Sequence, residues 1–300
     1  MIKSLNAYFQ KNEVAAWVLL LPSMFCLAIF LFIPLIMSFG LAFFDINIFL
    51  KDAKFVLFDN FIELMNDERF WNALGNTVYF TLMVVPVGVI FSLIVALLVS
   101  GNTLFNKLVR VVYYLPVICS MTAIGIMWAV LLDPAIGMFA YWLRVLGFKN
   151  VQLLKDPDLA MPLVAVMTIW KSFGQNMIIF VAGIQSIPND FYDASMIDGA
   201  SRWKQFFYIT LPSLVPVLGF CTITSTIGSF MVFDQTYVMT RGGPMFRTET
   251  LVQYVYTRGF IVSPFRLGYA SAAAFMLFIV IAAITMLMYQ FFMKKEAKGL

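Results

Sequence analysis

Charged residues are absent from several long stretches of the chain. The stretch over residues 159–189 is interrupted only by Lys171, and five others hold no charge at all: residues 14–44, 70–106, 111–132, 205–233 and 267–293. A helix needs about 20 apolar residues to cross the hydrocarbon core of a bilayer, and its backbone groups must be hydrogen-bonded within the segment. The pattern therefore predicts about six transmembrane helices, near residues 14–36, 77–99, 111–132, 160–186, 208–233 and 268–292.

The polar segments between these helices predict the topology. Six crossings put both termini on the same side of the membrane, with short tails at 1–13 and 293–300. Lys and Arg are nearly equal in number on the two sides, but the side with the termini has about half the loop length, so their density favours termini in the cytoplasm. The polar segment 187–207 then also lies in the cytoplasm. Three longer connections are expected to form small caps on the opposite side: residues 41–69, 133–158 and 234–266.

Composition supports a membrane protein and excludes several functional classes. The chain is 62% hydrophobic and only 12% charged, whereas soluble domains have about 25% charged residues, so we expect lipid to cover much of the surface. The net charge of +4 comes without a cluster of Lys or Arg, which argues against nucleic acid as a partner. The chain has no histidine, and its three cysteines lack a CxxC spacing. We therefore expect neither catalysis nor a metal or cofactor in this chain.

The segment 187–207 is the most polar connection between two of the predicted helices. Asn189 or Asp190 can cap the start of a short helix, and Gly199 can adopt the positive φ of a tight turn. Ser201 can then cap a second short helix that leads toward the fifth span. The pattern predicts a helix–turn–helix that projects into the cytoplasm. From the residues alone, an amphipathic connector resting on the membrane surface is the alternative.

The same segment, with the start of the fifth span, has a spacing found in a known family. The residues that carry it are Asp193-Ala194-Ser195-Met196-Ile197-Asp198-Gly199-Ala200, then Phe206, Ile209, Leu211-Pro212 and Pro216. They resemble the EAA loop of binding-protein-dependent ABC importer permeases, in which Glu-Ala-Ala is followed by three residues and Gly, and then by Ile-x-Leu-Pro. In this chain Asp193 replaces the Glu and Ser195 replaces the second Ala.

The resemblance extends over most of the chain. Further stretches are similar to carbohydrate-type permeases, above all to the larger pore subunit of maltose and glycerol-phosphate importers: Arg110-Val111-Val112-Tyr113-Tyr114-Leu115-Pro116, Trp128 with Asp133-Pro134, Gly242-Gly243-Pro244, Thr250-Leu251 and Gly268-Tyr269-Ala270-Ser271-Ala272. The resemblance implies an all-α polytopic membrane protein with the type I ABC importer permease fold. It also implies a prokaryotic cell membrane and both termini in the cytoplasm.

The resemblance also implies a function and a set of partners. The chain is expected to be the permease subunit of an ATP-driven, solute-binding-protein-dependent importer of a sugar or oligosaccharide. The alternative cargo is a charged derivative such as a glycerol-phosphate or a uronate. Implied partners are a second homologous permease subunit, two cytoplasmic ATPase subunits and an extracytoplasmic solute-binding protein. ATP and Mg are expected on the ATPase, since this chain has no G-x-x-x-x-G-K-[ST] loop.

Two groups of residues are candidates for the functional site. The resemblance implies that the EAA loop contacts the ATPase through Asp193, Ala194, Ser195, Asp198, Gly199 and Ala200. Polar residues inside membrane helices usually face protein or a water-filled path. The polar residues of the fourth span share one helix face by their i, i+3, i+4, i+7 spacing, and two serines follow in the fifth span. The resemblance implies that six of these polar residues lie on the substrate path: Thr168, Lys171, Ser172, Gln175, Ser225 and Ser229.

Alternatives remain open for these residues and for the function. Ser and Thr also serve helix packing in membranes, and Lys171 either meets the substrate or pairs with Asp234. An ion-coupled secondary transporter is disfavoured because it would normally have intramembrane carboxylates or histidines, and Asp234 alone lies beside a span. A membrane enzyme would need a clustered acid, base or metal set, which this sequence does not present.

Overall fold

The structure is a computed structural model that describes residues 12–49, 53–148 and 152–297. The predicted N-terminal tail therefore lies outside the described residues up to position 11, and residues 298–300 of the C-terminal tail do too. The chain divides into two compact units. One comprises Met1–Asn66 with Tyr256–Phe275, and the other comprises Asp67–Val255 with Met276–Leu300.

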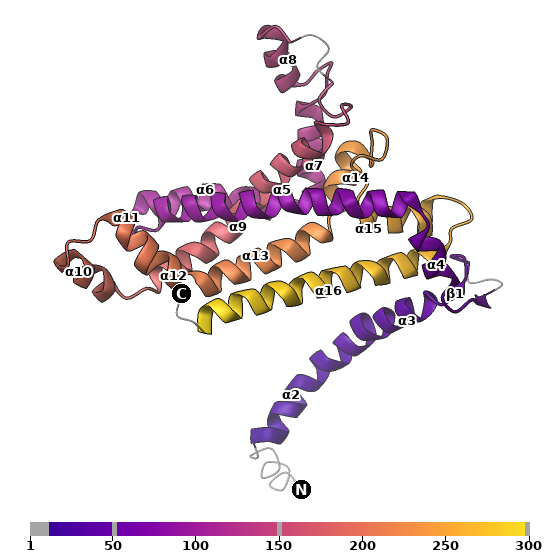
Figure 1. The fold of residues 1–300 in the computed structure, drawn as a ribbon, viewed down its shortest axis with the longest axis horizontal. Coiled ribbons are helices and arrows are strands. Elements are labelled where there is room, and N and C mark those ends of the chain that lie inside the picture. The colour runs from indigo at the N-terminus through magenta and orange to yellow at the C-terminus, as the bar shows by residue number, and fades with distance from the viewer. Residues whose placement is uncertain (1–11, 50–52, 149–151, 298–300) are drawn as a thin grey trace. The chain divides into compact units, whose positions relative to one another are not determined.

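The first unit begins with a long apolar helix. It is continuous over α2 (Asn12–Leu27), the π-helical turn η1 (Ala28–Phe32) and α3 (Ile33–Leu41), and is drawn in indigo in Figure 1. Its large side chains are exposed, with Leu19 at 80% and Phe30 at 78%. An exposed apolar helix of this length is typical of a surface that lipid or another subunit covers.

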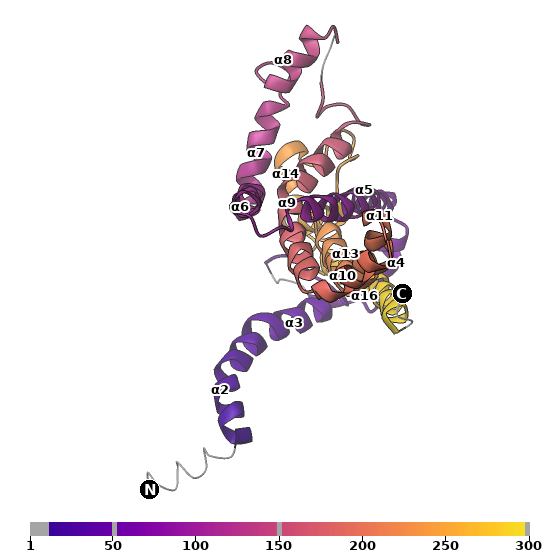
Figure 2. The same ribbon diagram turned by 90° about the vertical axis from the view of Figure 1, so that its left-hand side faces the viewer.

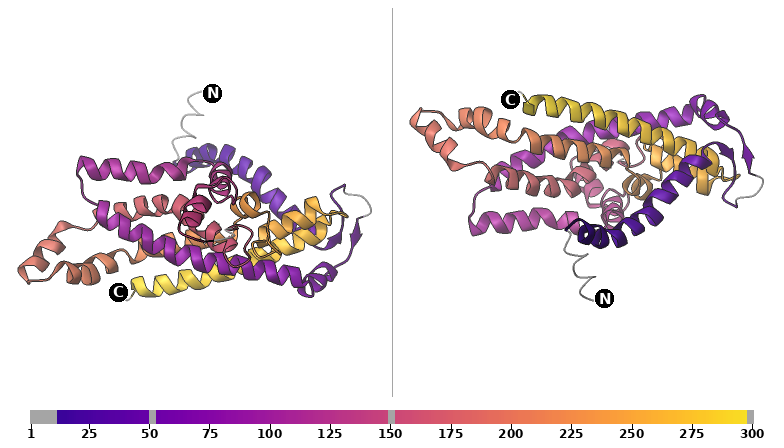
Figure 3. Two further views of the ribbon diagram at one scale, coloured as in Figure 1. Left: turned by 90° about the horizontal axis from the view of Figure 1, so that it is seen from above. Right: turned by 90° about the horizontal axis from the view of Figure 1, so that it is seen from below.

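The rest of the first unit is a small cap. Strand β1 (Phe44–Asp45) pairs antiparallel with β2 (Lys54–Phe55) and is followed by α4 (Asp59–Met65), as Figure 3 shows. Its later part holds the π-helical turn η3 (Thr257–Ile261) and the first residues of α16 (Leu267–Ala297). Arg266 donates two hydrogen bonds to the carboxylate of Glu63, which raises the pKa of the guanidinium.

Three helices form the centre of the second unit. Helices α5 (Glu68–Val99), α9 (Ala160–Gln185) and α13 (Val215–Phe230) lie side by side, as Figures 1 and 3 show. The C-terminal part of α16 contacts α13, where Gly219 leaves room for the ring of Phe292. The helices enclose two apolar clusters. One includes Val89, Phe173, Phe180, Leu214 and Cys221, and the other includes Phe80, Val84, Met161, Val164 and Val232.

The predicted third span is divided in the structure. Helix α6 (Leu104–Ile118) and α7 (Met121–Leu131) meet at an angle of 93° instead of forming one straight helix over 111–132. The backbone at Cys119 and Ser120 is extended. Pro116, near the end of α6, has no N–H for the helical ladder, which favours a break here. The uncharged run in the sequence did not indicate this bend.

The predicted fifth span is also bent. A helix over α11 (Arg202–Gln205), the π-helical turn η2 (Phe206–Thr210) and α12 (Leu211–Ser213) meets α13 at 63°. Pro216, the second residue of α13, cannot donate a hydrogen bond across this break. If each bent pair is counted as one span, the described residues contain up to six helices that are long and apolar enough to cross a membrane, and four if not.

The remaining helices of the second unit are short. They are α8 (Met138–Val145), α10 (Asn189–Ile197), α14 (Asp234–Thr240) and α15 (Leu251–Tyr256). Figures 1 and 2 show α7 and α8 projecting away from the central three helices. Between them, the carboxylate of Asp133 accepts hydrogen bonds from the backbone of Ala135 and Ile136 at 2.8 and 3.1 Å, which lowers the pKa of its carboxyl.

Candidate functional site

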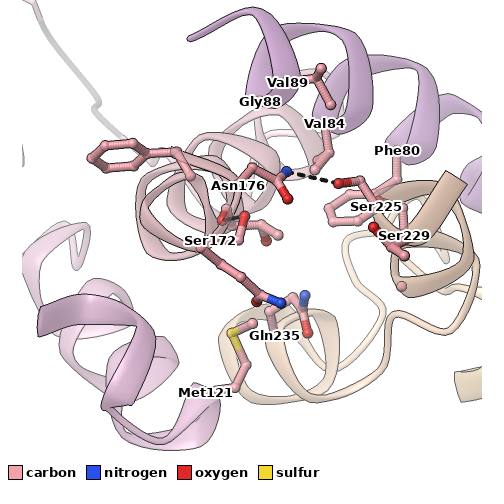
Figure 4. A pocket seen from close by; sticks show the side chains of 15 residues that line it. Phe80, Val84, Gly88, Val89, Met121, Ser172, Asn176, Ser225, Ser229 and Gln235 are labelled. Carbon is pink, nitrogen blue, oxygen red and sulfur yellow. Dashed lines mark hydrogen bonds between the residues drawn. The ribbon is translucent and has the colours of Figure 1, made fainter. Parts of the chain in front are cut away.

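A polar cavity lies among the central helices of the second unit. Its volume is about 230 Å³, and Figure 4 shows it from close by. Helices α5, α7, α9, α13 and α14 supply its walls, and its apolar lining includes residues from both core clusters. The polar side chains that line it are Thr168, Ser172, Gln175, Asn176, Thr224, Ser225, Ser229 and Gln235.

Local hydrogen bonds fix several of these side chains. Asn176 of α9 donates to the hydroxyl of Ser225 on α13 at 2.9 Å, which joins the two helices across the cavity wall, as the dashed line in Figure 4 shows. Thr168, Ser172 and Thr224 each donate to the carbonyl four residues earlier in their own helix, at 2.7–2.8 Å. Hydroxyls in membrane helices commonly bond in this way, which satisfies their hydrogen inside the helix.

The structure brings five of the six predicted path residues together. Thr168, Ser172, Gln175, Ser225 and Ser229 all line the cavity. Lys171 does not line it, and its ammonium donates to the carbonyl of Val117 at 3.3 Å. Contact of these residues with a substrate stays a prediction.

The ammonium of Lys171 lies at the end of α6, next to the break between α6 and α7. Val117 lies in the last turn of α6, where carbonyls have no partner within the helix and cations are favoured. No ion pair between Lys171 and Asp234 is present among the described residues. The amine therefore has a structural partner that neither of the two predicted roles had included.

Three polar lining residues were not among the candidates from the sequence. Asn176 is adjacent to the predicted face of α9, and Thr224 is adjacent to Ser225 on α13. Both were visible as polar residues within apolar runs, and only the strict helical spacing excluded them. Gln235 belongs to α14, past the predicted end of the fifth span at 233, so a search confined to spans had no signal for it.

The segment 187–207, which we call the coupling loop, folds as the predicted helix–turn–helix. Helix α10 ends in a turn in which Gly199 has a φ of +75°. The N–H of Gly199 bonds the carbonyl of Met196 at 3.1 Å, and that of Ala200 bonds the carbonyl of Ser195 at 2.9 Å. This pair of bonds is the Schellman arrangement, which requires a left-handed residue where Gly199 stands.

Caps at the two helix starts differ from each other. Ser201 accepts a hydrogen bond from the N–H of Lys204 at 3.5 Å, as predicted for the N-cap of α11. The prediction that Asn189 or Asp190 caps the first helix is wrong. Pro188 occupies that position without a side-chain bond, because the helix already begins at Asn189.

The two halves of the coupling loop are joined by a chain of hydrogen bonds. The side-chain amide of Gln205 donates to the hydroxyl of Ser195 at 2.9 Å, and this hydroxyl donates to the carbonyl of Tyr192 at 2.7 Å. The phenol of Tyr192 bonds the hydroxyl of Thr210 at 2.9 Å. Ser195, one of the two departures from the family pattern, is thus the residue that connects α10 to α11.

The outer surface of the coupling loop is largely apolar. The side chains of Phe191, Met196, Ile197 and Trp203 are exposed, Ile197 at 88%. Asp193, Ala194, Asp198 and Gly199 are exposed beside them, whereas Ser195 and Ala200 are half-buried. An apolar surface rimmed by polar groups is typical of a protein interaction site.

A second loop is tied firmly to α5. We call residues 241–250 the GGP loop, after Gly242-Gly243-Pro244. Its Glu249 is 1% exposed and receives two hydrogen bonds from Arg69 at 2.6 and 2.7 Å. The Arg69 guanidinium also stacks over the ring of Phe246, 3.9 Å from its centroid. Asn76 donates to the carbonyls of Phe246 and Glu249 at 2.7 and 3.0 Å.

Comparison with known proteins identifies the family. Residues 60–298 match the family described as "Binding-protein-dependent transport system inner membrane component". The chain is 32% identical to the lactose transport system permease protein LacF of Rhizobium radiobacter over 98% of both chains. It is 30% identical to the sn-glycerol-3-phosphate transport system permease protein UgpA of Agrobacterium fabrum, over 96% of this chain and 98% of the relative.

A solved structure supports the same fold. The fold is similar to that of a chain from a bacterial ABC transporter involved in the import of the acidic polysaccharide alginate, with a TM-score of 0.83, 24% identity, and coverage of 97% of this chain and 99% of that one. This likeness confirms the type I permease fold expected from the sequence. The family match and the two permease relatives confirm that the chain is a multi-pass, non-catalytic transport subunit of the inner membrane. The chain belongs to the family of binding-protein-dependent transport system inner membrane components.

Proposed function

We propose that the chain is the permease subunit of an ATP-driven importer of a sugar or oligosaccharide. The observation that carries this proposal is the cavity among the central helices, whose polar lining consists of hydroxyl and carboxamide groups. Such groups match the hydroxyls of a sugar, which donate and accept hydrogen bonds. The lactose permease relative, at 32% identity over nearly the whole chain, supports the same cargo class.

The partner proteins are inferred from the family and from the absence of an ATP-binding motif in this chain. A solute-binding protein delivers the cargo outside the cell, and a second homologous permease subunit completes the passage. Two cytoplasmic ATPase subunits bind ATP and Mg, because this chain has no phosphate-binding loop of the G-x-x-x-x-G-K-[ST] type. The family name, which specifies dependence on a binding protein, supports the first of these partners.

The coupling loop is the part that we assign to the ATPase contact. Asp193, Ala194, Ser195, Asp198, Gly199 and Ala200 belong to it. Its exposed apolar side chains need a partner surface, and its internal hydrogen bonds let it move as one piece. A cytoplasmic coupling loop places both termini in the cytoplasm, together with the tails at 1–13 and 293–300.

A steric test separates transport through the cavity from other functions. A Cβ added to Gly228, which lines the cavity, would meet no atom within 4 Å. The first carbon of a side chain is therefore accommodated at this position, and the ring of Gly228→Phe is expected to occupy the cavity. Gly75 on α5 also has no atom within 4 Å and does not line the cavity, so Gly75→Phe is the matched control.

The measurement is uptake of radiolabelled sugars by proteoliposomes that hold the complete transporter and its binding protein. We expect Gly228→Phe to reduce uptake at least tenfold, while Gly75→Phe and the wild type remain alike. Uptake that persists without ATP, or that Gly228→Phe leaves unchanged, would contradict the proposal.

A further inference from the structure

The lining of the cavity carries no charge. Of the residues that surround it, all of which the structure describes, each polar one is a Ser, Thr, Asn or Gln. Burying a carboxylate or phosphate without a cation to pair with costs several kcal/mol. The relatives named above include a glycerol-phosphate permease, so the fold alone does not decide the charge of the cargo.

The hydroxyl groups make the cavity rich in acceptors. A hydroxyl has one hydrogen, and Thr168, Ser172 and Thr224 direct theirs to backbone carbonyls of their own helices. What these three side chains present to a ligand is therefore lone pairs. Lone pairs repel an anionic oxygen and accept a hydrogen bond from a sugar hydroxyl.

Two carboxamides supply donors at one side of the cavity. Gln175 projects from α9 and Gln235 from α14, and Figure 4 shows Gln235 pointing into the space on the side of Met121. Gln235 is only 7% exposed. Among the bonds of the described residues, none uses either side chain, so both amides are available to a ligand that offers donors and acceptors together.

The lysine of α9 is engaged elsewhere. Lys171 precedes Ser172 in the sequence, but its ammonium donates to the carbonyl of Val117 at the break between α6 and α7. Turning it into the cavity would leave that helix-end carbonyl without its partner. An anionic cargo would therefore have to displace an existing hydrogen bond before it gained a counter-ion.

We propose that this cavity takes a neutral sugar unit and excludes uronates and sugar phosphates, with Gln175 and Gln235 as the residues that set this preference. The inference rests on the proposed function, because it concerns the charge class of the cargo at the same cavity. The buried carboxamide of Gln235 donates a hydrogen bond to a ligand hydroxyl through its NH₂ group and accepts one through its oxygen. Gln175, which is exposed, leaves its part of the lining without a cation.

The test measures direct binding to the complete transporter in nanodiscs, without the binding protein, whose own specificity would otherwise dominate. The probes are lactose, maltose and cellobiose, the same disaccharides with one CH₂OH oxidised to a carboxylate, and glycerol 3-phosphate. We expect at least one neutral disaccharide to bind at least tenfold more tightly than its uronate counterpart and than glycerol 3-phosphate.

Variants assign the preference to the two glutamines. Gln235→Leu should weaken binding of the neutral sugar about three- to tenfold, as expected for the loss of one hydrogen bond. Gln175→Arg should raise the affinity for the uronate at least tenfold, because it places a cation at the cavity. Thr222→Val is the control. Its hydroxyl bonds the carbonyl of Leu218 within α13 and does not line the cavity, so its binding should stay within twofold of the wild type.

The outcomes separate this inference from the function on which it rests. Uronate or phosphate binding as tight as that of the neutral sugars, with ATP-driven uptake intact, would overturn the neutral preference alone. Unchanged binding of the neutral sugar in Gln235→Leu, together with unchanged binding of the uronate in Gln175→Arg, would overturn the role of the glutamines. If no carbohydrate of either class bound and none was taken up, both the inference and the sugar importer would be contradicted.

Discussion

The GGP loop and the coupling loop have opposite relations to the rest of the chain. In the GGP loop, Thr248, Glu249 and Thr250 are at most 1% exposed, and Arg69 and Asn76 of α5 hold it by charge and hydrogen bonds. In the coupling loop, Ile197 is 88% exposed and Trp203 74%. Figures 1 and 3 place α10 at one end of the central helices and α14 and α15 toward the other.

The difference indicates that the GGP loop is covered by its own chain, whereas the apolar side chains of the coupling loop are suited to contact another protein. The carboxylate of Glu249 has its partner on α5, and the hydroxyls of Thr248 and Thr250 donate to the carbonyls of Gly243 and Val232. The conformation of the GGP loop is therefore fixed by the fold of this subunit. The coupling loop satisfies its own backbone through the turn at Gly199, yet leaves its apolar side chains open. A segment that is internally bonded and externally apolar is suited to transmit movement from another protein.

The largest effect is expected where the GGP loop is tied to α5. Arg69→Met would leave the buried carboxylate of Glu249 without its cation, which costs about 3–5 kcal/mol when one partner of a buried pair is removed. We expect the free energy of unfolding to fall by about this amount, measured by thermal unfolding of the purified complex in detergent. The double variant Arg69→Met with Glu249→Leu is the control, and it should regain most of the loss. Wild-type stability of the single variant Arg69→Met would contradict the role of this ion pair in holding the GGP loop to α5.

A smaller effect is expected at the turn of the coupling loop. Gly199→Ala would force a Cβ into a left-handed conformation that costs about 1–2 kcal/mol. No atom lies within 4 Å of that Cβ, so strain is the only cause. We expect the stability of the complex to fall by no more than this amount, while ATP hydrolysis loses its stimulation by cargo and binding protein. Gly75→Ala, within α5 and with the same free space, is the control and should leave the stimulation intact. Full stimulation in Gly199→Ala would show that the turn geometry does not matter for coupling.

The smallest effect is expected at the bond between α10 and α11. Ser195→Ala restores the alanine of the family pattern but removes the hydrogen bond from Gln205, worth about 0.5–1.5 kcal/mol. We expect a decrease of at most a few fold in the number of cargo molecules moved per ATP, measured in proteoliposomes. Gln205→Ala should give the same decrease, and the double variant should add nothing to it. Additive losses would mean that the two side chains act separately.

Much of the fold was accessible from the sequence because lipid imposes a simple rule. A run of about 20 uncharged residues predicts a crossing, and the long helices α5, α9 and α16 follow these runs. The bends near Ser120 and Leu214 were not accessible, since backbone breaks within an apolar run leave its hydropathy unchanged. Prolines stand near both bends, but Pro86 lies within the unbroken α5, so proline alone does not identify a break.

The site was predictable in part for a similar reason. Helical spacing identified Thr168, Ser172 and Gln175 on one face of α9, and all three line the cavity. The same spacing included Lys171, whose long side chain instead reaches the carbonyl of Val117 on α6. That carbonyl is available because the third span is broken just after it. Helical spacing within the fourth span gives no information about a break in the third. Gln235 was missed because it enters the cavity from a short helix outside the predicted spans.

The orientation and contact of the coupling loop test the account most directly. The test uses the substitution Ile197→Cys in a chain whose native Cys26, Cys119 and Cys221 have been replaced. It puts a thiol in place of the most exposed apolar side chain of α10. In right-side-out membrane vesicles, we predict that a membrane-impermeant thiol reagent leaves it unlabelled until the membrane is opened, and that a short bifunctional reagent then links it to the ATPase subunit. Labelling from outside, or no link to the ATPase in an active complex, would contradict the assignment of this loop.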